Sequence, residues 1–231
     1  MQLFYQPELI NGSHFLDSEE SRHAIKVLRK TIGDRIEVVD GKGTFYTVEV
    51  TEANFKKCEF KVINSRSETQ KAGFKHIAIA PTKNIDRIEW FVEKALEIGV
   101  DRISFIQCQN SERTVIRHER MLKKAISAMK QSIKATLPQI DELVKFGNFI
   151  KGQSADNKFI AYVDFENPVQ FKDHIESGRG NLILIGPEGD FSEEEVELAL
   201  KNNYEKVSLG DSRLRTETAG IAAVHLLNIF G

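Results

Sequence analysis

The sequence predicts an α/β protein in two parts, a small part made mostly of strands and a larger part that contains a mainly parallel sheet. Strand patterns fill residues 1–70, whereas apolar runs and helical patterns alternate beyond them. A polar stretch, residues 65–73, separates the two patterns and is the best candidate for a linker. Alternating strands and helices are typical of a parallel sheet that helices cover on both faces. The 231 residues suffice for one small and one medium domain.

The first part, residues 1–70, is expected to contain a β-hairpin and a short helix. Residues 35–39 and 45–50 read as strands on either side of an Asp-Gly-Lys-Gly turn, and residues 60–63 predict a further strand. Asp17 or Ser18 can cap the short helix. The side chains that this helix turns inward are expected to be Ala24, Ile25 and Leu28.

The second part, residues 71–231, is expected to alternate strands and helices. The candidate strands are residues 76–80, 102–107, 159–163, 181–185 and 206–209. The candidate helices are residues 86–98, 119–135, 168–176, 193–201 and 218–230. The glycine-containing and polar segment 144–157 is expected to be a surface loop.

Two helix ends in this part are specified by their local chemistry. Gly99 is expected to stop the helix before it. Ser192 and Glu195 have the spacing of a capping box, and Phe191 can pack on Val196 as a hydrophobic staple. The turn that precedes Ser192 is therefore expected to be rigid.

Composition excludes several classes of protein. At 41% hydrophobic and 29% charged residues, the chain has the composition of an ordinary globular protein. No apolar run approaches the roughly 20 residues that span a membrane, and the first residues lack the features of a signal peptide, so a cytoplasmic location is expected. Cys58 and Cys108 are too few for a disulfide framework or a zinc site, and no metal is expected.

The net charge of −2 argues against uniform binding of nucleic acid, but the charges are unevenly distributed. Residues 113–134 contain seven Lys or Arg and a single acid, Glu119, whereas residues 188–197 contain six acids and no base. A basic strip beside an acidic one can orient a polyanion without a basic total. A solvated helix face is the alternative explanation of the basic strip.

Two turns follow predicted strands, at residues 186–190 and 209–217. Gly186 and Gly189 remove side chains where a ligand approaches the backbone, although glycines also occur in ordinary turns of α/β domains. The turn at residues 186–190 has the spacing neither of a P-loop nor of a dinucleotide-binding fingerprint. The glycines by themselves do not decide between a binding turn and a structural one.

Taken together, Gly186-Pro187-Glu188-Gly189 and the string from Leu209-Gly210 to Leu214-Arg215-Thr216-Glu217-Thr218-Ala219 resemble the RsmE family of the SPOUT superfamily. The resemblance implies a SPOUT-type α/β domain with a trefoil knot and a small N-terminal PUA-like β-barrel. It also implies methylation of uracil N3 in 16S ribosomal RNA, in the decoding region, with S-adenosyl-L-methionine as cofactor. Substrate RNA within the assembled 30S subunit is a further expectation.

The resemblance assigns site residues. The cofactor-binding residues would be Leu184, Ile185, Gly186, Pro187, Gly189, Leu209, Gly210, Ser212, Leu214, Arg215 and Thr218. Arg215 is the candidate for stabilising charge on the uracil oxygens, and Glu188 and Glu217 are both candidates for the base or its orienter. Two of these assignments have structural alternatives, since Leu209 and Leu214 can be core residues and Glu217 can stabilise a helix start.

The RNA-binding residues by resemblance would be His23, Lys26, Arg29, Lys83, Arg87, Arg113 and Lys134. Trp90 is expected to be a packing residue rather than a stacking surface. The chain departs from the family where Asp190 replaces a glycine, where Asp211 and Ser212 replace proline and arginine, and where Lys134 replaces an arginine. The last change keeps the charge but loses bidentate phosphate recognition.

The expected final helix is apolar on several sides, and only His225 and Asn228 interrupt the run after Thr218. Such a helix is either deeply buried or shared with a second copy, and the resemblance favours a homodimer. Two alternative functions stay open. One is a non-catalytic RNA-binding protein with the SPOUT fold, and the other is a SPOUT methyltransferase that acts on another RNA position.

Overall fold

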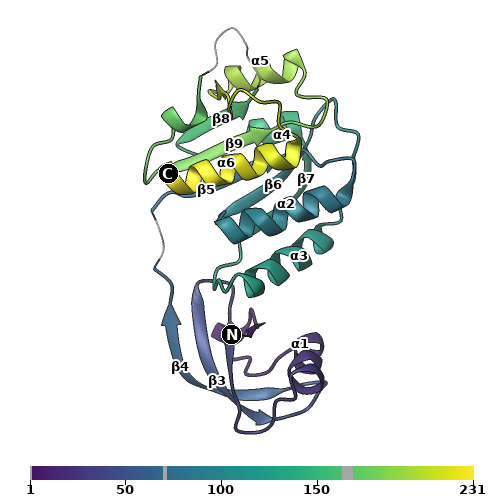
Figure 1. Ribbon diagram of the computed structural model, residues 1–231, viewed down its shortest axis with the longest axis vertical. Helices are drawn as coiled ribbons and strands as arrows, with labels where there is room; N and C mark the ends of the chain where they lie inside the picture. Colours follow the sequence, from purple (N-terminus) through teal and green to yellow (C-terminus); the bar gives the residue numbers. More distant parts are fainter. Residues whose placement is uncertain (1, 70–71, 163–168) are drawn as a thin grey trace. The chain divides into compact units, whose positions relative to one another are not determined.

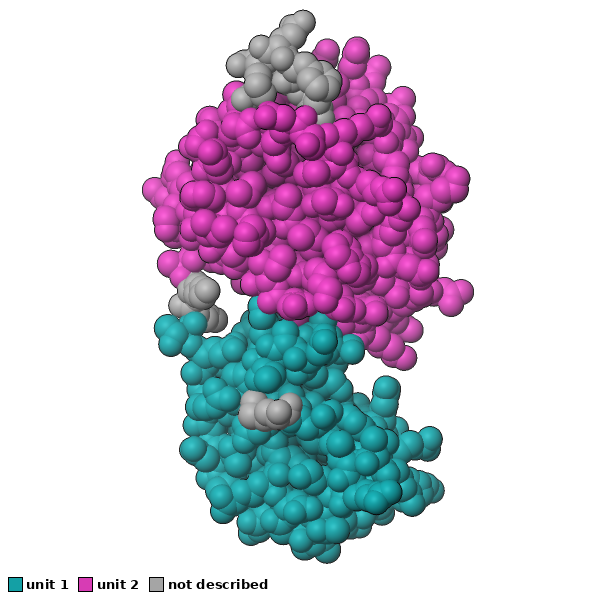
Figure 2. Space-filling view, viewed as in Figure 1, with its two compact units in different colours: residues 1–70, 126–137 teal, residues 71–125, 138–231 magenta. Residues whose placement is uncertain are grey.

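The computed structural model describes residues 2–69, 72–162 and 169–231. The chain forms two compact units (Figure 2). Unit 1 comprises residues 1–70 and 126–137, and unit 2 comprises residues 71–125 and 138–231. Unit 1 thus includes a short stretch from the middle of the chain as well as the N-terminal residues.

Unit 1 is built on one four-stranded sheet with the order β1-β2-β3-β4. Strands β1 and β2 run parallel, and β2-β3 and β3-β4 are antiparallel. The predicted hairpin is confirmed, with Val38 opposite Tyr46. The short β1 was not predicted, because three residues are too few for an alternating pattern. The strands are β1 (Leu3–Tyr5), β2 (Arg35–Val39), β3 (Thr44–Glu52) and β4 (Glu59–Ser67).

The short helix α1 (Ser18–Arg22) begins at the predicted cap, Asp17, whose side chain accepts hydrogen bonds from the backbone N–H groups of Glu19 and Glu20. It continues into one turn of π-helix, His23–Val27. Of the three residues expected to point inward, Ala24 is fully buried, whereas Ile25 and Leu28 are only half-buried.

The extra residues of unit 1 join it through side chains and backbone. The Lys130 ammonium pairs with the largely buried Glu20 carboxylate, and the backbone N–H of Leu137 donates to the carbonyl of Gly41 at 2.9 Å. The linker prediction is wrong for residues 65–67, which complete β4 opposite β3. Residues 70–71 of that stretch lie outside the described residues.

Unit 2 contains the predicted parallel sheet, with six strands in the order β10-β8-β9-β5-β6-β7. Every neighbouring pair is parallel. The strands are β5 (Phe74–Ile79), β6 (Arg102–Gln107), β7 (Gln139–Lys145), β8 (Asn157–Ala161), β9 (Gly180–Ile185) and β10 (Glu205–Val207).

Helices cover both faces of this sheet (Figure 1). On one face, α6 (Thr216–Phe230) lies over β5 and β9 beside α2 (Ile85–Ile98). The Asn228 amide donates to the carbonyl of Gly99 at 2.6 Å and so ties α6 to the end of α2, where Gly99 stops the helix as predicted. Helix α3 (His118–Gln131) runs beside α2 and pairs Arg120 with Glu89. The other face carries α4 (Phe146–Ile150) and α5 (Glu193–Lys201).

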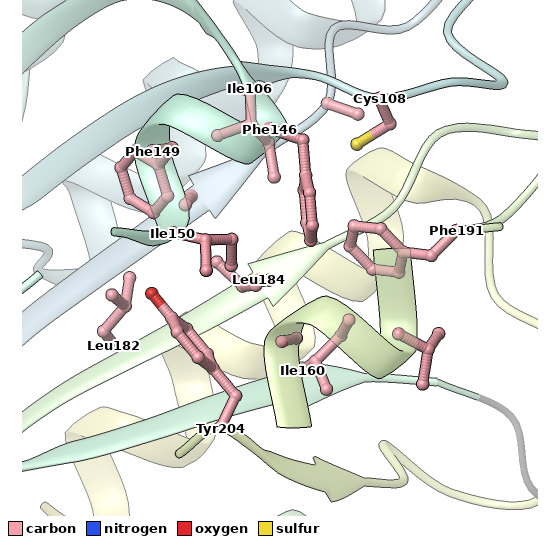
Figure 3. Packing of buried hydrophobic residues seen from close by; sticks show 14 residues of the cluster. Ile106, Cys108, Phe146, Phe149, Ile150, Ile160, Leu182, Leu184, Phe191 and Tyr204 are labelled. Atoms are coloured by element: carbon pink, nitrogen blue, oxygen red, sulfur yellow. The ribbon is translucent and has the colours of Figure 1, made fainter. Parts of the chain in front are cut away.

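The prediction of a loop at residues 144–157 is wrong. Strand β7 extends to Lys145, and α4 follows directly with three buried apolar side chains, Phe146, Phe149 and Ile150. Figure 3 shows the ring of Phe146 facing that of Phe191 and the side chain of Ile150 next to Leu184, all within one apolar core. Glycine and polar residues surround these five residues, and so short a helix has no periodic pattern that sequence analysis can detect.

The expected helix at residues 168–176 is also wrong. Only a short 3₁₀ turn, Phe171–Asp173, forms there, and residue 168 lies outside the described residues. Among residues 169–176, Phe171 is the one large apolar side chain that is fully buried, so a longer helix would gain little burial. The helix expected at 119–135 ends at Gln131, because Ile133 takes a left-handed conformation (φ 54°). None of the described helices is both long and apolar enough to cross a membrane.

Candidate active site

The two glycine-containing turns leave the carboxyl edge of the parallel sheet, where α/β proteins bind ligands. Strands β5 and β9 are neighbours at the centre of the sheet, and the chain departs from them in opposite directions. The loops that follow them are joined. The backbone N–H of Ala80 donates to the carbonyl of Ile185, and the backbone N–H of Lys83 donates to Oε1 of Glu188, both at 2.9 Å. Sequence segments more than 100 residues apart therefore meet at this crevice.

The turn after β9 is closed by a hydrogen bond from the N–H of Asp190 to the carbonyl of Pro187 at 2.9 Å. Asp190 adopts a left-handed conformation (φ 62°), which suits the glycine that the resemblance leads one to expect there. Aspartate tolerates this conformation when its side chain bonds locally, and here its carboxylate accepts the N–H of Phe191 at 2.8 Å. Burial raises the pKa of the Asp190 carboxyl, and this hydrogen bond and the charge of Arg213 oppose that rise.

Both glycines of the turn lie close to neighbouring side chains. A Cβ on Gly186 would lie 3.1 Å from the ring of Phe191, and a Cβ on Gly189 would lie 3.1 Å from Cβ of Asn110. The Asn110 amide donates to the carbonyls of Gly189 and Asp190 at 3.2 and 3.1 Å. The turn thus presents its backbone from a fixed position, and the loop after β6 holds it there.

The start of α5 is fixed as predicted. The Ser192 hydroxyl and the Glu195 carboxylate form the capping box reciprocally with each other's backbone N–H groups. Glu195 also accepts the N–H of Gln109 through its second oxygen at 2.8 Å. Gln109 and Asn110 were missed by the sequence analysis, although their polar side chains directly after an apolar strand are the signal that could have found them.

Two basic residues expected to bind RNA are engaged within this site. The Arg113 guanidinium donates to the carbonyl of Thr82 at 2.9 Å and to the carbonyl of Lys83. The Lys83 ammonium pairs with Glu112 at 2.7 Å, and both partners are well exposed. Arg113 therefore joins the loops after β5 and β6, and RNA binding by either residue stays a prediction.

The second turn, before α6, is more open. Gly210 has φ 119°, and its N–H donates to the Ser208 hydroxyl at 3.2 Å. Leu209 and Leu214 are half-buried, so neither is a core residue, and Gly210, Ser212, Arg215 and Thr218 are exposed. In contrast, the side chains of Leu184 and Ile185 are fully buried in β9. Those two residues can offer a cofactor only their backbone.

A pocket of about 600 Å³ opens at the start of α6 and α2. Glu217 is 7% exposed, and its Oε1 lies 3.8 Å from Nε of Arg87. Its other oxygen, Oε2, is buried and has no hydrogen-bond partner among the described residues. The lining consists of Asp86, Arg87, Trp90, Arg213, Leu214, Arg215, Glu217 and Thr218.

The pocket brings together Arg215 and Glu217, both named from the sequence as catalytic candidates, and adds Arg87. Glu188, the third candidate, is not part of this lining and is held instead by the backbone of Lys83. Trp90 differs from its expected role, since it is 45% exposed and lines the pocket. The spacing of the apolar residues in α2 could not show whether Trp90 points into the core or lies at the edge of the buried helix face.

The four remaining RNA-binding candidates lie in unit 1. The His23 ring lies 5.9 Å from that of Phe4, and the Lys26 ammonium lies 4.9 Å from the ring of Phe55. Arg29 is exposed in a left-handed conformation (φ 55°). Lys134 follows the end of α3.

A second polar cluster, at the amino edge of the sheet, has Ser, His and Asp side chains. Nε2 of His76 lies 2.7 Å from the Ser104 hydroxyl, which donates to Asp141. Because the hydroxyl proton goes to Asp141, His76 donates to Ser104 and cannot activate it as a nucleophile. Burial, with a contribution from Arg102, lowers the pKa of His76 to about 3. We assign this cluster a structural role.

No group of three or more His, Cys, Asp or Glu residues in the described ranges is placed to hold a metal ion.

Two family models match the chain. Residues 69–228 match the RNA methyltransferase domain, and residues 16–63 match the RNA methyltransferase PUA domain. The fold and the site therefore belong to an RNA methyltransferase with an N-terminal PUA-like domain.

Individual relatives indicate which family of RNA methyltransferases the chain resembles. A probable rRNA-methyltransferase from Porphyromonas gingivalis has a crystal structure that is 43% identical, with a TM-score of 0.91 over 99% of both chains. Ribosomal RNA small subunit methyltransferase E of Aquifex aeolicus is 28% identical over the full length of both chains. The enzyme of that name from Neisseria gonorrhoeae, solved bound to S-adenosyl methionine, is 27% identical with a TM-score of 0.83, and the match covers 97% of this chain and 95% of that one. The chain belongs to the RsmE family of small-subunit ribosomal RNA methyltransferases, which confirms the resemblance seen in the sequence.

Proposed function

We propose that this protein transfers the methyl group of S-adenosylmethionine to N3 of a uridine in 16S ribosomal RNA. The observation that carries the proposal is the pocket where Arg215 and the buried Glu217 meet at the end of the second glycine-containing turn. The bound S-adenosyl methionine of the Neisseria gonorrhoeae relative supports the cofactor. The decoding region of the assembled 30S subunit as substrate, a cytoplasmic location and the trefoil knot belong to the same proposal.

In the proposed function, the two predicted domains have different roles. Residues 71–231 bind the cofactor and perform the transfer, with the turn backbones of residues 186–190 and 209–215 around the donor. Residues 1–70 bind RNA through the basic residues His23, Lys26 and Arg29.

The transfer is a direct displacement at the donor methyl group. The protein must therefore align N3 of the uracil with the methyl carbon and accept the proton that N3 loses. N3 is paired in a duplex, and the target base must therefore be unpaired or flipped. Glu217 is the better candidate for the base because it shares the pocket with Arg215. Glu188 accepts the N–H of Lys83, which suits a residue that fixes the cofactor turn.

Calorimetric titration with S-adenosylmethionine tests the proposal, and Gly189→Val tests the turn. A valine side chain at this position would press on Asn110, which holds the turn in place. We expect wild-type binding and a complete loss of measurable binding in Gly189→Val, with an almost unchanged melting temperature. Gly152→Val is the matched control, because no atom lies within 4 Å of its added Cβ. Equal affinities of Gly189→Val and wild type would refute the assignment of this turn. Absence of binding by the wild type would favour the non-catalytic alternative.

The basic strip of residues 113–134 gives a test of RNA binding. Lys124 pairs with Glu93 at 3.5 Å and Arg120 pairs with Asp86 and Glu89, whereas Arg117 and Lys123 are exposed and have no ion pair among the described residues. Reversing Arg117 and Lys123 to glutamate is expected to weaken binding of small-subunit RNA by about tenfold or more. The slope of log affinity against log salt should fall by about 1 for each lysine or arginine that contacts phosphate. The exposed Lys151→Glu is the control, and an unmoved RNA affinity in the double variant would mean that the strip is a solvated helix face.

The protein is also expected to be a homodimer. On the inner side of α6, Ala223, Val224 and Leu227 are fully buried. Ile229 and Phe230, near the end of the same helix, are 57% and 43% exposed. A second copy is the partner that such an apolar outer side suits, since a two-fold interface uses one patch twice. Sedimentation at micromolar concentration should give twice the 26.2 kDa of the chain. A clean monomer that still methylates RNA would contradict this.

A further inference from the structure

The pocket at the start of α6 combines one indole, that of Trp90, with the guanidinium groups of Arg213 and Arg215. Its volume of about 600 Å³ lies within the roughly 300–1,000 Å³ usual for small-molecule sites. The Arg213 and Arg215 guanidinium groups have no hydrogen bond or ion pair with any described residue. Both can therefore donate to a ligand without breaking a hydrogen bond or ion pair of the described residues.

Trp90 offers a large aromatic surface to this pocket. Its neighbours on α2, Phe91 and Val92, are fully buried, whereas Trp90 is 45% exposed. Stacking of a nucleic-acid base on an aromatic side chain strengthens binding by about 5- to 150-fold. An indole next to free guanidinium groups is a combination that suits a nucleotide better than an apolar ligand.

Glu217 supplies the pocket with a carboxylate acceptor that still lacks a hydrogen-bond donor. Its Oε2 is buried without a donor, and such an atom is destabilising until a donor reaches it. Uracil presents an N3–H donor between two carbonyl acceptors, so the carboxylate suits N3 and the two free arginines suit the carbonyls. Cytosine presents an unprotonated N3, which would face the carboxylate with a second acceptor. This arrangement therefore favours uracil over cytosine.

We infer that this pocket holds the target base, with uracil stacked on Trp90 and its N3–H directed to the Glu217 carboxylate. The inference rests on the proposed function and names the residues that recognise the base. N3 gives its proton to Glu217, and the electron pair left on N3 forms the bond to the donor methyl carbon. The bond from that carbon to sulfur breaks, and both of its electrons remain on sulfur. Arg87, 3.8 Å from Oε1, is a positioning residue that orients the carboxylate.

The chain contains a single tryptophan, so its fluorescence reports on Trp90 directly. The probes are five-nucleotide oligouridylate and oligocytidylate, titrated into the full-length protein with S-adenosylhomocysteine present. Oligouridylate should quench the fluorescence at saturation and bind at least about tenfold more tightly than oligocytidylate. Glu217→Gln should lose most of that discrimination, because an amide can donate to N3 of cytosine as well as accept from uracil. Quenching that is absent while anisotropy reports oligouridylate bound would overturn the inference.

Substitutions at Trp90 supply a second measurement, read by anisotropy of labelled oligouridylate. Trp90→Ala should weaken binding by about 5- to 150-fold, and Trp90→Phe should retain most of the affinity. Leu200→Ala, which removes a 44% exposed side chain on α5 outside the pocket, should leave it unchanged. Wild-type affinity in Trp90→Ala would overturn the inference.

Trp90 could instead contact a second copy of the chain. Trp90→Ala would then sediment as a monomer, and wild-type fluorescence would change on dilution but not with oligouridylate, which would also overturn the inference. These binding measurements need no turnover. A protein that binds oligouridylate through Trp90 but methylates no uridine would therefore contradict the proposed function without contradicting the base site.

Discussion

Arg215→Ala is expected to lower the turnover of RNA methylation by about 10²- to 10³-fold, the usual cost of removing one donor that stabilises developing charge. The Arg215 guanidinium makes no hydrogen bond or ion pair with a described residue, so its loss removes no contact that the fold needs. The melting temperature should stay at the wild-type value. The affinity for S-adenosylmethionine should change far less than turnover, because the contact forms mainly in the transition state.

Arg179→Ala is the matched control, since it removes another exposed arginine, whose one ion pair among the described residues is with the nearby Glu176. It should leave both turnover and cofactor affinity unchanged. Arg215→Lys should lie between wild type and Arg215→Ala, because lysine keeps the charge but not the planar fork. A loss in Arg215→Ala that is confined to cofactor affinity would make Arg215 a binding residue and contradict the proposed role.

Gly220→Ala is expected to destabilise unit 2 by about 1–3 kcal/mol, although alanine is the better helix former. Gly220 lies inside α6, and a Cβ there would approach the Phe91 ring to 2.5 Å and Ile79 to 3.0 Å. Both neighbours are fully buried, so neither can move aside freely. The close approach of α6 to α2 and β5 thus depends on this missing side chain. Thermal unfolding should show a fall of about 2–4 °C for each kcal/mol.

Gly147→Ala is the control for this prediction. Gly147 lies in α4, and the nearest atom to its added Cβ is Leu198 Cδ2 at 4.0 Å. Alanine at that position should be neutral or should stabilise by about 0.4–1 kcal/mol. If Gly220→Ala melts at the wild-type temperature or above it, the tight packing of α6 against α2 is wrong.

Local chemistry made several elements predictable. The capping box of Ser192 and Glu195, the stop at Gly99 and the hairpin around residues 40–43 all depend on neighbours in the chain. Each was found where the pattern placed it. The parallel sheet also followed from the sequence, because near-continuous apolar runs alternate with amphipathic helices.

The errors have a common cause. Residues 146–150 form a helix because Phe146, Phe149 and Ile150 are buried beneath α5, and nothing in their immediate neighbours requires it. In contrast, residues 168–176 resemble a helix but contain only a 3₁₀ turn at 171–173 within the described part of the chain. In both segments, tertiary burial rather than local propensity decides the structure.

The sequence by itself determined the family, through the GPEG and LRTETA strings, and with it the residues to inspect. The tertiary structure decided which of them act together. Glu188 is bonded to the backbone of Lys83, and Glu217 faces Arg87 across 3.8 Å with one buried oxygen left without a donor. Trp90 entered the site only because its position on α2 faces the start of α6. A motif records the types of side chain and their order, whereas burial and pairing depend on segments that meet across more than 100 residues of chain.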